Sequence, residues 1–144
     1  MGAPVFFNYI LNGKGVEKWQ PQFTYYGFRF IQIEGAVPEG YPNPNNLPVI
    51  KDIKGIHTRS AAENVGTFNC SNPLFNNIHK LIDWSIKSNL ASVITDCPHR
   101  EKLGWLEQSY LMGNSIRYNY DLATLAPKIM GDMQASQTAK WHGA

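Results

Sequence analysis

A run of thirteen residues, Asp96 to Gln108, concentrates side chains that could carry out acid–base chemistry on a polar substrate. It reads DCPHREKLGWLEQ and holds three carboxylates, two cations, a histidine and a tryptophan. Pro98 restricts its own φ and biases Cys97 away from the helical region, which predicts a turn. The preceding residues 90–95 are small and mostly apolar, as expected of a buried lead-in. A buried segment that opens into a charged loop is typical of an active-site rim. The alternative is a solvated loop whose charges pair with one another.

Two motifs in this chain resemble those of a known enzyme family. Residues 96–105 read Asp-Cys-Pro-x-Arg-Glu-x-Leu-Gly-Trp, similar to the signature of the inverting α-L-rhamnosidases of glycoside hydrolase family 78. The similarity continues through the apolar helix expected after Trp105 and through Tyr120-Asp121. Residues 23–30, FTYYGFRF, resemble the Phe-Thr-Tyr-x-Gly-Phe-Arg-Tyr strand of the β-sandwich that precedes the catalytic barrel in that family. The resemblance covers roughly residues 13–137.

The resemblance implies glycoside hydrolysis with inversion, in which one carboxyl protonates the leaving oxygen and a second carboxylate activates water. These two groups stand roughly 6.5–9.5 Å apart in such enzymes. Glu101 occupies the position of the family's general acid, and Trp105 could restrict its hydration and favour its protonated form. The alternative is that Glu101 pairs with Arg100 or Lys102 in solvent. The family's general base is a glutamate far downstream of this segment, so we expect this chain alone to be inactive.

The same resemblance implies sugar-binding roles for several neighbours of Glu101. Asp96 matches an aspartate that binds sugar hydroxyls. An aspartate here could also cap the turn at Cys97-Pro98, and both roles can hold at once. Arg100 could donate to hydroxyls and Trp105 could offer an apolar face, the alternatives being a salt link and a core aromatic. His99 stands at a variable position and is assigned no role.

The chain departs from the common family pattern just after Trp105. Many members have Gly-Asp where this chain has Glu107-Gln108. Gln108 can still bind a hydroxyl but cannot ionise, and Glu107 could supply the charge with a one-residue shift or face solvent. We therefore include both as candidate substrate-binding residues, with the sugar specificity, aglycone and linkage left open.

The first sixty residues are predicted to form strands and turns. Val5–Leu11, Phe23–Glu34 and Val49–Thr58 are rich in aromatic and β-branched residues. The pair Asn12-Gly13 predicts a turn. Gly27, inside the second strand, indicates a bulge or a close backbone approach.

Three helices are predicted after Ser60. The first has a capping residue at Ser71 or Asn72, Pro73 at its first position and an end near Asn89. The second should run from Gly104 to Asn119. Asp121 could cap the third helix. Pro127 should either kink this helix or mark a later start for it. The residues expected to follow the inner faces are Leu74, Ile78, Leu81, Ile82 and Ser85, then Leu106, Tyr110, Leu111 and Ile116, then Leu122, Leu125, Ile129, Met130 and Met133.

Strands followed by helices indicate either two separate regions or an α+β fold. The resemblance is more specific: residues 1–60 would be the C-terminal part of a β-sandwich and residues 61–144 the first helices of an (α/α)6 barrel. Three helices cannot close a toroid of six hairpins. We therefore expect an incomplete barrel and a fragment of a much larger enzyme.

Composition excludes several other classes of function. The chain has 144 residues, 17% of them charged, a net charge of +2 and no Lys/Arg cluster, which argues against nucleic acid. No apolar run approaches the roughly 18 residues of a membrane span. The cysteines and histidines do not have the spacing of a zinc site, so no metal and no cofactor are expected. The residues considered are His57, Cys70, His79, Cys97 and His99. The two cysteines are expected to be free thiols.

The expected partner is therefore a rhamnose-containing glycoside or polysaccharide. Two alternatives stay open: a non-catalytic carbohydrate-binding or interaction module, and an (α/α)6 glycosidase for another sugar. The composition does not decide the oligomeric state or the compartment, and the resemblance is compatible with a periplasmic or extracellular enzyme.

Overall fold

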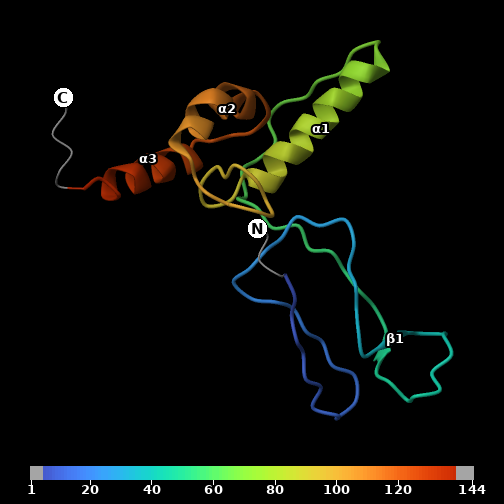
Figure 1. The fold of residues 1–144 in the computed structure, drawn as a ribbon. Coiled ribbons are helices and arrows are strands. Elements are labelled where there is room, and N and C mark those ends of the chain that lie inside the picture. Colours follow the sequence, from blue (N-terminus) through green and yellow to red (C-terminus); the bar gives the residue numbers. More distant parts are fainter. Residues whose placement is uncertain (1–4, 139–144) are drawn as a thin grey trace.

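A computed structural model describes residues 5–138. The elements follow the order β1 (Val37–Pro38), β2 (Val49–Ile50), α1 (Pro73–Asn89), α2 (Leu106–Asn119) and α3 (Leu125–Ala135). The three helices gather in one region, and residues 5–60 form long extended loops in another (Figure 1). The loop between α1 and α2 lies where these two regions meet. The order of strands before helices confirms the α+β character that was predicted.

The strands predicted in the first region are mostly wrong. Val5–Leu11 and Phe23–Glu34 form no strand, and only the first two residues of the predicted Val49–Thr58 strand pair with another segment. β1 and β2 form a short parallel pair, with Val37 opposite Val49. Residues with high β propensity form a ladder only where a second strand offers its backbone groups. Within residues 5–138 the two longer segments have no such partner strand.

The predicted turn at Asn12-Gly13 is confirmed. Gly13 has a φ of 73°, which favours glycine. The Glu17 carboxylate accepts hydrogen bonds from the Asn12 and Gly13 amides at 2.9 and 3.2 Å, and from the Tyr9 hydroxyl at 2.7 Å. One carboxylate therefore holds this loop closed.

The predicted helix boundaries are largely confirmed. α1 begins with Asn72, whose side chain accepts from the Leu74 amide at 2.9 Å, and has Pro73 at its first position. It ends at Asn89, as predicted. α2 begins at Leu106, two residues later than predicted, because Trp105 has a non-helical ψ of 128°.

Pro127 marks a late start of α3 rather than a kink. It is the third residue of the helix, where an amide has no intrahelical partner to lose. Asp121 accepts a hydrogen bond from the Ala123 amide at 2.8 Å, so it caps the turn before α3, and Thr124 is the N-cap of the helix.

The hydrophobic core lies where the three helices and their loops meet. Its buried apolar residues are Ile86, Leu90, Ile94, Ile116, Tyr120 and Ile129, with Ala62, Val93, Leu122, Leu125 and Met133 packed against them. The prediction is thus confirmed for Ile116, Ile129, Leu122, Leu125 and Met133.

The remaining residues predicted to face inward are exposed, and for them the prediction was wrong. These are Leu74, Ile78, Leu81, Ile82 and Ser85 of α1, Leu106, Tyr110 and Leu111 of α2, and Met130 of α3. An apolar stripe is buried only where another element packs on it. In the described chain the helices bury mainly the residues next to the loops that join them, which leaves the stripes uncovered.

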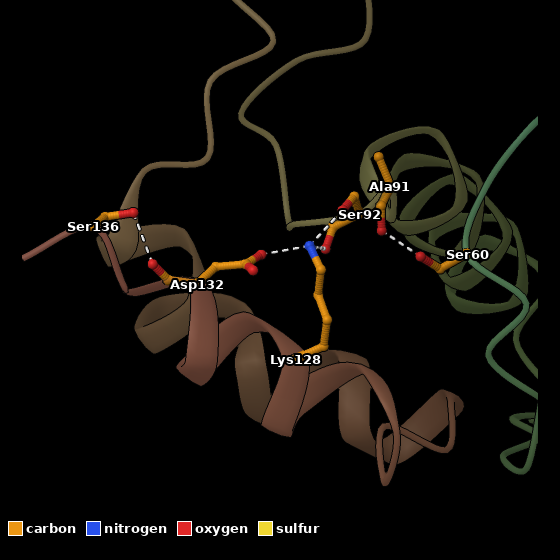
Figure 2. Close-up of polar contacts among 6 residues, drawn as sticks. All are labelled: Ser60, Ala91, Ser92, Lys128, Asp132 and Ser136. Atoms are coloured by element: carbon orange, nitrogen blue, oxygen red, sulfur yellow. Dashed lines mark hydrogen bonds and ion pairs between the residues drawn. The ribbon is translucent and has the colours of Figure 1, made fainter. Parts of the chain in front are cut away.

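Backbone hydrogen bonds join the segment before α1 to the ends of the helices. Ser60 donates from its amide to Leu90 O at 2.7 Å, and its hydroxyl donates to Ala91 O (Figure 2). The Val65 amide donates to Asn119 O at 2.9 Å. Figure 2 also shows Lys128 of α3 reaching Ser92, whose carbonyl it meets at 2.9 Å, while it pairs with Asp132.

Residues 5–138 contain no helix that is both long and apolar enough to cross a bilayer. The same residues hold no group of three or more His, Cys, Asp or Glu side chains that could bind a metal ion. Cys70 and Cys97 are free and half-buried.

Candidate active-site loop

The segment from Asp96 to Leu103 forms a closed loop. Asp96 donates from its amide to Leu103 O at 3.0 Å, and its Oδ1 accepts from the Leu103 amide at 2.9 Å. Inside the loop the Glu101 amide donates to the Cys97 Sγ at 3.2 Å. Lys102 has a φ of 56°, and this left-handed residue turns the chain back toward Asp96. The predicted turn at Cys97-Pro98 is therefore part of a larger loop with a hydrogen-bonded neck.

Asp96 is held in its ionised form by this neck. Partial burial by itself raises the pKa of Asp96, but hydrogen bonds from the Leu103 amide and from the Cys97 side chain and amide outweigh that effect. The pKa of Asp96 consequently lies below its ordinary value. The carboxylate thus caps the loop, a role that is compatible with sugar binding, and it keeps its negative charge.

The loop packs against the segment Tyr25–Gly27. The Gly27 amide donates to Pro98 O at 3.0 Å. A Cβ atom added at Gly27 would lie 3.0 Å from the Pro98 Cγ and 3.4 Å from the His99 Cβ. Gly27 is therefore a position of close backbone approach, one of the two possibilities that the sequence predicted.

Lys102 provides a second attachment to the same segment. Its Nζ donates to Tyr25 O at 2.5 Å. The ammonium also lies 3.8 Å from the centre of the Tyr26 ring and 4.8 Å from that of Tyr25. Such cation–π contacts are attractive because the ring face is electron-rich.

Glu101 and Arg100 are exposed between these attachments. In the part of the chain that the structure describes, the Glu101 carboxylate forms no ion pair with Arg100 or Lys102, the pairing that was its alternative role. Trp105 is 48% exposed at the N-cap of α2. Glu107 is exposed in the first turn of α2, and Gln108 is partly buried there.

The loop is thus defined by its own contacts and not by a cavity. A hollow of about 330 Å³ lies between the segment 60–62, Ser92 and the start of α3, and another of about 580 Å³ lies beside Thr58 and the segment 20–25. None of the predicted site residues lines either hollow. The structure brings Asp96 and Lys102 into the framework of the loop and leaves Glu101 and Arg100 on its outer surface. Their catalytic and binding roles stay predictions.

Family models match both parts of the chain. Residues 63–144 match the bacterial alpha-L-rhamnosidase 6 hairpin glycosidase domain, and residues 2–57 match the bacterial alpha-L-rhamnosidase concanavalin-like domain. The chain belongs to the bacterial α-L-rhamnosidase family. The family resemblance that the two motifs carry is thereby confirmed.

Curated relatives are similar in sequence to most of this chain. An alpha-L-rhamnosidase of Formosa agariphila is 35% identical over 133 residues, which is 92% of this chain and 13% of the relative. One of Streptomyces avermitilis is 30% identical over 132 residues, 91% of this chain and 12% of the relative. The chain therefore spans only about an eighth of the length of these rhamnosidases.

Solved structures of rhamnosidases share the arrangement. The native rhamnosidase of Aspergillus terreus aligns with a TM-score of 0.68 and 36% identity, covering 87% of this chain and 14% of its own. The rhamnosidase of Dictyoglumus thermophilum aligns with a TM-score of 0.54 and 36% identity over 56% of this chain and 9% of its own. The layout of most of the chain is thus shared with these rhamnosidases, whose own chains are much longer.

Sequence reasoning missed two structural roles in this region. Lys102 stands at a variable position of the motif, which gave it no predicted role. The only signal in the sequence was the segment Tyr25-Tyr26-Gly27, whose two aromatic rings could receive a cation. Tyr120 was noted as part of the family pattern without a role. It is fully buried, and its hydroxyl donates to Asp83 Oδ1.

Proposed function

We propose that this chain is part of a longer α-L-rhamnosidase that removes terminal α-L-rhamnose from glycosides or polysaccharides by single-displacement inversion. Residues 1–60 would be the end of its β-sandwich domain and residues 61–144 the opening helices of its (α/α)6 catalytic domain. Family membership in both parts and the names of the relatives support this proposal. The rhamnose-containing substrate follows from the same likeness.

In this mechanism Glu101 is the general acid. Its protonated carboxyl donates to the glycosidic oxygen as the bond to the anomeric carbon breaks. A water molecule attacks the opposite face of the sugar, and a carboxylate outside this chain takes the proton from that water. The ionised Asp96 would accept hydrogen bonds from sugar hydroxyls. Arg100, Trp105, Glu107 and Gln108 would complete the contacts to the sugar.

One observation carries the assignment within this chain. Of the charged groups in the loop, Asp96 closes its neck and Lys102 attaches it to Tyr25 and Tyr26, whereas the Glu101 carboxylate has no such partner among residues 5–138. A proton donor needs a carboxyl that is free to meet the leaving oxygen. Glu101 meets this condition on a loop held at both sides.

Glu101→Gln in the full-length enzyme tests the proposal. With an alkyl rhamnoside, kcat should fall by about 10²–10⁴-fold, because an amide cannot protonate the leaving oxygen. Glu34→Gln, at an exposed glutamate outside the loop, serves as the matched control and should leave kcat unchanged.

Product analysis by NMR should show β-L-rhamnose first, as inversion requires. Aryl glycosides of rhamnose, glucose and galacturonic acid distinguish this activity from that of a glycosidase for another sugar. Near-normal turnover by the Glu101→Gln enzyme would remove Glu101 from the role of acid.

A further inference from the structure

We propose that Lys102 is a positioning residue for the general acid. It holds the loop 96–103, and with it Glu101, against the aromatic segment Tyr25–Gly27. This inference rests on the proposed function of Glu101, and it assigns to the N-terminal part of the chain an indirect role in catalysis, that of holding the loop that carries the acid.

The contacts of Lys102 are specific to its side chain. The ammonium lies 2.5 Å from Tyr25 O and 3.8 Å from the centre of the Tyr26 ring, and the lysine is half-buried. No carboxylate pairs with it among residues 5–138. Its charge is therefore directed to the N-terminal segment and not to its neighbours Glu101 or Asp96.

The surface that receives Lys102 is itself supported. Phe7 lies edge-on to Tyr26, with 6.0 Å between ring centres, and edge-on to Trp19 at 5.8 Å. Trp19 in turn stacks with Tyr9 at 5.4 Å. Edge-to-face and offset arrangements at these separations are favourable for aromatic pairs. The aromatic cluster formed by Phe7, Tyr9, Trp19 and Tyr26 thus offers a defined ring face to the ammonium.

The position of Lys102 in the loop carries this support to Glu101. Gly27 binds Pro98 O three residues before Glu101, and Lys102 binds Tyr25 O one residue after it. Lys102 also adopts the left-handed conformation, with a φ of 56°. This conformation is uncommon for a non-glycine residue. Releasing the ammonium would free this turn and allow Glu101 to move relative to the substrate.

The test uses Lys102→Met in the full-length enzyme, which keeps an unbranched side chain and removes the charge. Two rhamnosides are compared, one with an alkyl leaving group and one with a 2,4-dinitrophenyl leaving group. The second departs with little need of a proton, so only the first depends on where Glu101 lies. We expect kcat for the alkyl rhamnoside to fall by about 10- to 100-fold, since small misplacements of a catalytic group have effects of that size. For the dinitrophenyl rhamnoside we expect a change of less than about threefold, and KM for both should change little.

Two further variants control the experiment. Lys102→Arg retains a cation that can donate to Tyr25 O and cover Tyr26, so it should recover most of the activity. Lys54→Met removes a lysine whose side chain is 80% exposed, and it should leave kcat unchanged for both substrates. If Lys102→Met does not fold, Tyr26→Leu removes the nearer ring from the other side of the contact and should give the same selective loss.

The outcomes separate this inference from the proposed function. Equal losses on both substrates, or no loss on either, would show that Lys102 does not position the acid. If Glu101→Gln itself had no selective effect on the alkyl rhamnoside, the proposed function would fail first. Selective loss in Glu101→Gln without selective loss in Lys102→Met would overturn the inference alone.

Discussion

Replacing Tyr120 with phenylalanine should lower the free energy of unfolding of the chain by about 1.5–3 kcal/mol at neutral pH. Tyr120 has no exposed surface, and its hydroxyl donates to Asp83 Oδ1 across the packing of α1 and the end of α2. The substitution keeps the ring and its packing and removes only this donor. The change therefore measures mainly the buried hydrogen bond from this hydroxyl to a charged acceptor.

The structure places the expected value near the lower end of that range. Asp83 would not be left without partners, because Lys87 donates to its Oδ2 at 2.6 Å. The side chains of Lys87 and Asp83 are 24% and 18% exposed, so this ion pair is partly shielded from solvent. Loss of the Tyr120 donor weakens the support of Asp83 but leaves its charge paired. We expect about 1.5 kcal/mol.

The same network predicts how this difference depends on pH. Burial by itself raises the pKa of Asp83, but hydrogen bonds from Lys87 and Tyr120 and the charge of Lys87 hold it below its ordinary value. A carboxyl with a lowered pKa in the folded state stabilises the fold above its unfolded pKa of about 3.9, and this contribution is lost as the pH falls through the folded value. The effect of Tyr120→Phe should therefore be full at pH 7 and shrink below about pH 4.

Urea unfolding followed by far-UV circular dichroism at pH 7 and at about pH 3 measures both quantities. Tyr118→Phe is the matched control, since Tyr118 is 75% exposed near the same end of α2. It should change the free energy by less than about 0.5 kcal/mol. A Tyr120→Phe effect below 0.5 kcal/mol, or one that is equal at the two pH values, would contradict the reasoning.

Two further substitutions test the packing of the helical region. Ile86→Ala should destabilise the chain by about 2–5 kcal/mol in urea unfolding, because Ile86 is 5% exposed in the core, whereas Leu81→Ala at 71% exposure should have little effect. Gly66→Ala should destabilise by about 1–3 kcal/mol in the same assay, because its Cβ would lie 1.9 Å from Tyr118 O. Gly113→Ala should be neutral or stabilising, because a Cβ at this position of α2 would meet open space. Equal effects of the two glycine variants would contradict the close contact between Gly66 and Tyr118 O.

The helices could be predicted from the sequence because their signals are local. Asn72 and Pro73 specify the start of α1 through a side-chain cap and a ring that needs no amide partner. Pro127 likewise specifies a late start of α3. Which helix face is buried depends on what packs against it, and periodicity alone could not distinguish the buried Ile86 from the exposed Leu81.

The N-terminal strands could not be predicted correctly because a strand is defined by a partner at a distance in sequence. Phe23–Glu34 has strand-like composition, yet Phe28 and Phe30 are 62% and 91% exposed in the described chain. Composition reports the tendency to be extended and says nothing about which segment supplies the ladder. The close approach at Gly27 could be predicted because a neighbouring backbone comes that near only where a residue has no side chain.

In the candidate site, too, local features could be predicted from the sequence and contacts between distant segments could not. Asp96 and Glu101 could be selected from the motif, and the turn at Pro98 from proline geometry. The role of Lys102 could not be predicted, because its contacts lie 77 residues away in sequence. A lysine directly after Glu101 suggests a local ion pair, but the ammonium contacts an aromatic face and a carbonyl instead.

The position of the loop at the junction of the two regions gives this arrangement a physical rationale. A loop that presents a proton donor must be exposed, so it cannot be held by burial in the helical core. It is held instead at its neck by Asp96 and Leu103, and along its length by Gly27 and Lys102. The first contact lies within the helical region, and the other two reach into the N-terminal region. If Glu101 is the general acid, as proposed, its orientation would therefore depend on contacts with both regions, although the N-terminal region supplies no catalytic residue in this mechanism.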